Sequence, residues 1–192
     1  MAELTVAGTE LREELPMTSL PMERNNLQIF HINLNVRDLE ASARFYAALG
    51  FRIVNDFGVG GVPTEARRVG DKDPALPRIL GVDPDSRSRA ILMRLGEDPR
   101  ATLLDLIQWE EPRTGGEPAH MSQAGMARLC FKVKDADGAY AAAQAAGAQC
   151  LSEPLTIDLG GTRQKVFCCL DPDGAILEFM EFIKTGKRES SD

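Results

Sequence analysis

Cysteine, histidine and tryptophan are scarce in this chain of 192 residues. It has four cysteines, two histidines and one tryptophan. The cysteines show no CxxC spacing and lie in apolar stretches typical of strands: Cys130, Cys150, Cys168 and Cys169. They therefore indicate buried free thiols rather than a disulfide framework or a zinc site.

The chain also lacks a basic excess and a long apolar run. It carries 22 Lys and Arg against 29 Asp and Glu, which gives a net charge of −7. This balance argues against a nucleic-acid partner, which would require a basic face. No apolar run approaches the roughly 20 residues that a membrane span needs. The first residues do not read as a secretion signal, so we expect a cytoplasmic protein without a membrane partner.

One pattern of strand, helix and strand occurs twice. Residues 28–56 contain strand formers, a helix N-cap and a glycine that ends the helix. Residues 126–150 repeat this plan with equivalent positions 97 apart, since 135 − 38 and 147 − 50 agree: Asp38 with Asp135, and Gly50 with Gly147. The repetition predicts a duplicated module.

Further strand patterns complete each module. Residues 51–56, 89–95 and 101–109 read as strands in the first module, and residues 162–170 and 175–182 in the second. Prolines break residues 64–87, where we expect short helical turns. The predicted fold class is α+β, with two βαβββ modules in tandem that form a curved mixed sheet around a cavity. The predicted boundaries are an N-terminal extension at 1–26, modules at 27–110 and 126–183, a linker at 111–125 and a polar tail at 184–192.

Two segments carry a resemblance to a known family. FHINLNVRDLEASARFYAALGF and FCCLDPDGAILEFMEF resemble the vicinal oxygen chelate superfamily. This superfamily includes glyoxalase, methylmalonyl-CoA epimerase, extradiol dioxygenases and bleomycin- or fosfomycin-resistance proteins. The resemblance spans about residues 27–183 and implies the glyoxalase-like fold. It does not select a reaction, because one fold hosts many functions.

The resemblance also implies four metal-ligand positions, on the first and last strand of each module. Ligand-type side chains stand at three of them: His31, Asp105 and Glu178. The fourth position is Arg128, which lies 97 residues after His31 where the family usually has a second histidine. Guanidinium has no lone pair for a metal and stays cationic, but it can pair with carboxylates.

Three interpretations of this site are open. In the first, His31, Asp105 and Glu178 hold a divalent zinc, manganese or iron ion, and Arg128 binds an anionic substrate group. In the second, no metal binds, Arg128 stabilises an oxyanion, and His31 or Glu178 transfers a proton. In the third, the polar cluster is structural and the cavity sequesters a ligand.

The sequence thus favours a lyase or isomerase that acts on a small carbonyl compound. An extradiol-type dioxygenase is a weaker alternative, because Arg128 replaces the second histidine of the required iron site. A non-catalytic resistance-type binding protein is the other alternative. The two modules either complete one cavity within the chain or pair between the chains of a homodimer.

Overall fold

The computed structural model describes residues 28–56, 67–71 and 75–183. The predicted N-terminal extension and polar tail lie outside these residues. The helical segments are α1 (Leu39–Ala48), η2 (Val69–Asp71), α2 (Leu76–Leu80) and α3 (Ala136–Ala145). The strands are β1 (His31–Asn35), β2 (Phe51–Asp56), β3 (Arg67–Arg68), β4 (Arg87–Leu95), β5 (Leu103–Glu111), β6 (Arg128–Val133), β7 (Gln149–Cys150), β8 (Leu155–Leu159), β9 (Thr162–Leu170) and β10 (Ile176–Ile183).

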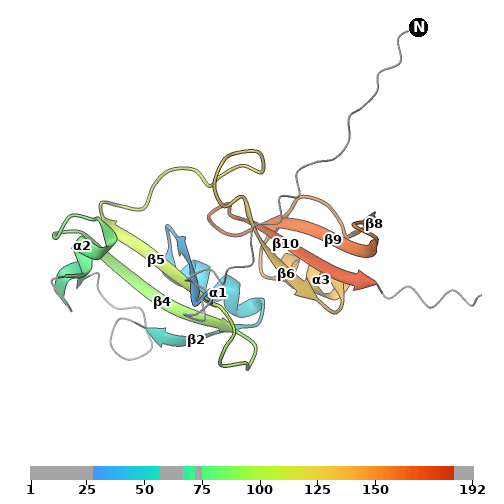
Figure 1. Cartoon of the computed structure of the whole chain (residues 1–192), viewed down its shortest axis with the longest axis horizontal. Coiled ribbons are helices and arrows are strands. Elements are labelled where there is room, and N and C mark those ends of the chain that lie inside the picture. The colour runs from blue at the N-terminus through green and yellow to red at the C-terminus, as the bar shows by residue number, and fades with distance from the viewer. Residues whose placement is uncertain (1–27, 57–66, 72–74, 184–192) are drawn as a thin grey trace, which may run out of the picture.

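Each module forms its own mixed sheet. The strand order is β1-β5-β4-β2 in the first sheet, where β3 also pairs with β4. It is β6-β10-β9-β7 in the second, where β8 also pairs with β9. In both sheets the first strand of the module is an edge strand that runs parallel to the last strand. Figure 1 shows the modules side by side, joined by the linker that runs from β5 to β6.

The structure confirms the α+β fold class. The helices of the two modules also occur at the predicted separation in sequence. Helices α1 and α3 each have ten residues, and their first residues are 97 apart, since 136 − 39 is 97. The side chains of Asp38 and Asp135 cap them by accepting hydrogen bonds from backbone N–H groups, as their sequence positions predict. Gly50 and Gly147 follow with positive φ angles of 97° and 87°, which glycine adopts without strain.

Strand β8 is the longer of the two strands that the sequence pattern did not predict, and the other is the two-residue β3. It forms a hairpin with β9 through Gly160 and Gly161, which both have positive φ angles. Its side chains are exposed, because β8 is an edge strand that pairs only with β9. The described part of the stretch 64–87, residues 67–71 and 75–87, contains short helical turns as predicted, together with β3.

One hydrophobic core joins the two modules. It contains the apolar face of each sheet and the buried faces of α1 and α3. A continuous row of aromatic rings crosses from the first module into the second: Tyr46, Phe51, Phe131, Phe179, Phe167 and Tyr140. The contact between Phe51 of β2 and Phe131 of β6, at 5.9 Å between ring centroids, lies where the modules meet. The modules therefore share the stability that apolar burial provides.

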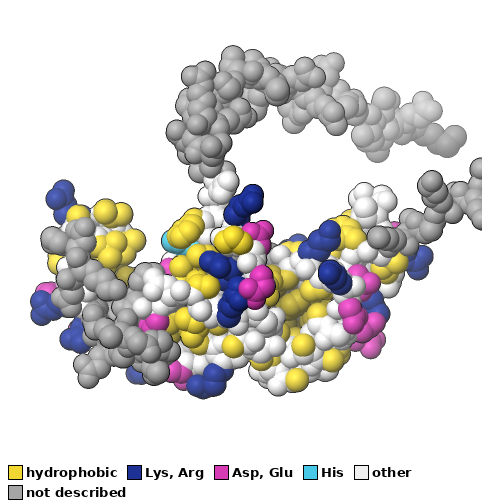
Figure 2. All heavy atoms as spheres, turned by 90° about the horizontal axis from the view of Figure 1, so that it is seen from below, with side chains coloured by type: hydrophobic (Ala, Val, Ile, Leu, Met, Phe, Trp, Pro, Cys, Tyr) yellow, Lys and Arg dark blue, Asp and Glu magenta, His cyan; other side chains and the backbone are white. Residues whose placement is uncertain are grey.

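The sheet faces that point away from the helices carry the polar side chains of interest. Along β1, Ile32 and Leu34 pack against the core, whereas His31, Asn33 and Asn35 are exposed on the opposite face. We call the faces that point away from the helices the open faces. On the side of the molecule seen in Figure 2, basic and acidic side chains are interspersed rather than gathered into one basic surface. None of the described helices is long and apolar enough to cross a membrane.

Candidate functional site

The first module places His31 and Asp105 on the adjacent strands β1 and β5. Strands β1 and β5 are parallel, and Asn33 is the register partner of Asp105. The Asn33 amide nitrogen donates a hydrogen bond of 2.8 Å to one carboxylate oxygen of Asp105. The other oxygen, Oδ1, is buried and has no hydrogen-bond partner within the described part of the chain. An ionised carboxylate can accept at both oxygens, so this group has unused acceptor capacity.

The environment of Asp105 disfavours its charge. The residue is only 8% exposed. Burial raises the pKa of Asp105 above its usual range, whereas the field of His31 and the hydrogen bond from Asn33 lower it. Burial is the largest of these effects, and the pKa remains raised overall. A buried carboxyl with a perturbed pKa next to an exposed histidine is a typical feature of functional sites.

The second module places Arg128 and Glu178 in the equivalent arrangement. The Arg128 Nε atom donates to Glu178 at 2.7 Å, and Cys130, the register partner of Glu178, is a further hydrogen-bond partner of this carboxylate. Burial is the main cause that raises the pKa of the Cys130 thiol to about 11, so the thiol stays protonated at neutral pH. The predicted pairing of Arg128 with a carboxylate is thus present for Glu178.

The predicted metal ligands do not form one cluster. Within residues 28–56, 67–71 and 75–183, no group of three or more His, Cys, Asp or Glu side chains could hold a metal ion. His31 is electrostatically coupled to Asp105, whereas Glu178 forms an ion pair with Arg128. His31, Asp105 and Glu178 therefore do not present three ligands to one divalent metal ion in this structure.

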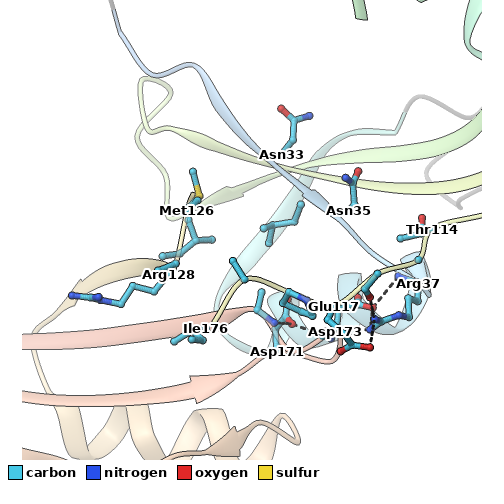
Figure 3. A pocket seen from close by; sticks show the side chains of 18 residues that line it. Asn33, Asn35, Arg37, Thr114, Glu117, Met126, Arg128, Asp171, Asp173 and Ile176 are labelled. Carbon is cyan, nitrogen blue, oxygen red and sulfur yellow. Dashed lines mark hydrogen bonds and ion pairs between the residues drawn. The ribbon is translucent and has the colours of Figure 1, made fainter. Parts of the chain in front are cut away.

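A cavity of about 300 Å³ lies where the edge strands β1 and β6 approach each other. Its lining includes Asn33 and Asn35 of β1, Arg128 of β6, and part of the linker, but not His31, Asp105 or Glu178. Figure 3 shows the Arg128 side chain extending away from Asn33 and Asn35. The structure therefore forms two separate pairs beside a shared cavity, instead of one four-residue site. We call this space the seam cavity.

A polar contact joins the modules at Asp171, which lines the seam cavity. The Tyr46 hydroxyl of α1 donates a hydrogen bond of 2.8 Å to Asp171, which follows β9 in the second module. Both residues are buried, and burial is the largest cause that raises the pKa of each. Beside them, Arg37 pairs with Asp173, and Figure 3 shows this pair next to Asp171. These contacts fix the position of α1 against the second module.

A second cavity of about 390 Å³ lies on the open face beside the seam cavity. Its wall includes Trp109, and it shares Asn35, Thr114 and Gly115 with the seam cavity. The Trp109 indole N–H donates a hydrogen bond of 2.9 Å to the side-chain oxygen of Asn35. We call this space the Trp109 cavity. His120 is exposed in the linker and lines neither cavity.

Sequence reasoning missed Asn33 and Asn35. A signal for them was present, because residues two and four positions after His31 on a strand share its face. Sequence reasoning also missed the contact of Tyr46, because its partner Asp171 lies 125 residues away. No local pattern identifies such a partner.

The comparison with protein families agrees with this architecture. A family model described as the Glyoxalase/Bleomycin resistance protein/Dioxygenase superfamily matches residues 28–179. The chain belongs to this superfamily. The match covers both modules and the linker, so the resemblance seen in two short segments holds over most of the chain. The superfamily includes several reactions, and membership alone does not choose among them.

Solved structures of the superfamily share the fold at low sequence identity. A glyoxalase family protein from Bacillus cereus has 15% identity and a TM-score of 0.65, and the match covers 82% of this chain and 95% of that one. One from Enterococcus faecalis has 21% identity and a TM-score of 0.53, with coverage of 80% and 97%. The trypanothione-dependent glyoxalase I of Leishmania major has 17% identity and a TM-score of 0.51, with coverage of 81% and 86%. No curated protein is similar enough to count as a match.

Proposed function

We propose that this superfamily member is a lyase or isomerase that moves a proton next to the carbonyl group of a small molecule. The observation that carries the proposal is the placement of exposed His31 on β1 and buried Asp105 on the adjacent parallel strand β5, where one carboxylate oxygen of Asp105 has no partner among the described residues. An imidazole next to a fixed carboxylate can take a proton, because the negative charge stabilises the imidazolium that forms.

Each residue of this group has one task in the proposed step. His31 removes a proton from the carbon next to the substrate carbonyl and later returns it. Asp105 stabilises the cationic imidazole, and its unpartnered Oδ1 can accept an imidazole N–H. Asn33 fixes the other oxygen of Asp105 and thereby the orientation of the carboxylate. The proton that leaves the substrate carbon resides on His31, and the electron pair moves to the carbonyl oxygen as an enolate.

The proposal assigns no proton transfer to Arg128 or Glu178. These side chains satisfy each other at 2.7 Å, and Arg128 is 43% exposed at its side chain. The seam cavity supports a second candidate function, in which the chain binds a small molecule without converting it. His31, Asp105 and Glu178 do not form the cluster that the iron site of an extradiol dioxygenase requires.

Deuterium exchange separates an enzyme from a binding protein. We expect the wild type to exchange the carbon-bound protons of hydroxyacetone in deuterated water faster than buffer does, as followed by proton NMR. His31→Gln should lose most of this acceleration, on the order of 100-fold, which is typical for removal of a general base. His120→Gln is the matched control, because it removes the other histidine from the exposed linker.

The outcomes of this experiment are distinct. Exchange by the wild type and by His120→Gln, but not by His31→Gln, supports the proposed role of His31. A wild type that exchanges hydroxyacetone no faster than buffer contradicts the proposal and favours the binding protein. Equal rates in His31→Gln and the wild type would remove His31 from the reaction.

A further inference from the structure

The open face of β1 presents two side-chain amides whose orientations are set by their partners. A carboxylate oxygen can only accept, so the Asn33 group that faces Asp105 must be its nitrogen. The indole N–H of Trp109 can only donate, so the Asn35 group that faces it must be its oxygen. The orientation of both amides therefore follows from chemistry.

Each amide keeps one polar atom for a ligand. Asn33 retains its side-chain oxygen as an acceptor, and Asn35 retains its side-chain nitrogen as a donor. Neither atom has a hydrogen-bond partner among the residues described for this chain. Both side chains are exposed and project from the same side of β1 (Figure 3). The strand thus offers an acceptor and a donor on one side, from residues two positions apart.

The Trp109 cavity supplies the surroundings of this pair. Asn35 lines both cavities, so a ligand on the amides can extend along Trp109, Val82 and Pro112. The charged side chains of the Trp109 cavity are Arg113 and Asp83, which are opposite in sign. Apolar walls with balanced charge favour a neutral ligand with an apolar body.

We propose that Asn33 and Asn35 bind the amide group of a neutral ligand, with its N–H donated to Asn33 and its carbonyl accepting from Asn35, while an apolar body fills the Trp109 cavity. Side chains two residues apart on a strand are separated by roughly 6.5 Å. A single amide can bridge that separation through two hydrogen bonds of about 2.9 Å each. This assignment of ligand class goes beyond the proposed proton transfer.

Binding can be followed through the fluorescence of Trp109, which is the only tryptophan in the chain. We use benzamide as the probe, because it carries an N–H beside a carbonyl on a neutral aromatic body. We expect it to change the fluorescence with a dissociation constant on the order of 1 mM, as suits a ligand of this size. Benzoate and benzamidine should bind at least about tenfold more weakly, because each mismatches one of the two asparagines.

The variant Asn35→Asp tests the assignment as a switch. Its carboxylate can still accept from Trp109, but it offers an acceptor where the asparagine offered a donor. We expect this variant to lose benzamide at least about tenfold and to gain benzamidine by a similar factor. Gln149→Glu is the matched control, because it adds the same charge at an exposed residue of β7 in the other module.

The results that would overturn the assignment are specific. They are a wild type that binds benzamide, benzoate and benzamidine equally, a wild type that binds none of them, or an Asn35→Asp variant that keeps the wild-type preference. Because this titration measures binding alone, it can succeed when hydroxyacetone exchange fails. The reverse result, exchange without benzamide binding, would reject the amide site and leave the role of His31 intact.

Discussion

Tyr46→Phe is expected to lower the free energy of unfolding by about 2 kcal/mol, which is typical for a hydrogen bond to a charged group. The substitution removes one hydroxyl and leaves a buried oxygen of Asp171 without its donor, 2.8 Å away in the wild type. For a chain of this length, the loss should lower Tm by roughly 4–8 °C. Urea denaturation at neutral pH measures the difference.

Tyr140→Phe is the control for the loss of a tyrosine hydroxyl. Tyr140 packs its ring against Phe167, but its hydroxyl makes no hydrogen bond among the described residues. Tyr140→Phe should therefore lower the free energy of unfolding far less than Tyr46→Phe does. If the two variants were equally stable, the contact between Tyr46 and Asp171 would not hold the modules together.

The effect of Tyr46→Phe should also depend on pH in the alkaline range. The raised pKa of Tyr46 means that the folded state holds the phenol proton more tightly than the unfolded state does. The contribution of this phenol proton to stability is fully present below the pKa of an unfolded tyrosine, which is about 10. It is lost as the pH rises above that pKa towards the folded pKa of Tyr46. The stability difference between the wild type and Tyr46→Phe should therefore narrow above pH 10 or so.

Asp105→Asn is expected to stabilise the protein by about 1 kcal/mol at neutral pH, because it removes a buried charge that is only partly compensated. A neutral amide oxygen in that place can still accept from Asn33. The folded pKa of Asp105 is raised, so its contribution to stability is present at low pH and is lost as the pH rises through the folded pKa. The gain from the substitution should accordingly appear above that pKa and disappear in acid.

Asp158→Asn removes the same formal charge from an exposed position on β8 and serves as the reference. If the two variants changed the unfolding free energy equally at every pH, the effect would come from net charge and not from burial of Asp105. A wild type that is more stable than Asp105→Asn at neutral pH would show that the carboxylate is structural. Stability gained together with exchange activity lost would be the expected signature of a functional carboxylate.

Local features of the fold could be predicted because their signals are local. The caps at Asp38 and Asp135 and the turns after the helices depend on residues within a few positions. The duplication extended these assignments to the second module. Even β8 had a usable signal, since the Gly160–Gly161 pair before β9 is typical of a tight hairpin.

The candidate site could be predicted only within each module. Register on parallel strands places Asp105 beside β1 and Glu178 beside β6, and the repeat relates His31 to Arg128. How the two pairs lie relative to each other depends on packing between the modules, which no sequence period encodes. The interpretation of Arg128 as a partner for carboxylates agrees with its contact to Glu178. Whether Arg128 also lies close to Asp105 could not be predicted from the sequence.

The proposed function depends on an electrostatic interaction between His31 and Asp105 on the open face of β1 and β5. Carbon-13 NMR titration of the Asp105 carboxyl in the wild type and in His31→Gln measures this coupling directly. We expect the pKa of Asp105 to lie above its ordinary value in the wild type and to rise further in His31→Gln, because the field of His31 lowers it. The same Asp105 pKa in both proteins, or an ordinary value in the wild type, would contradict the account.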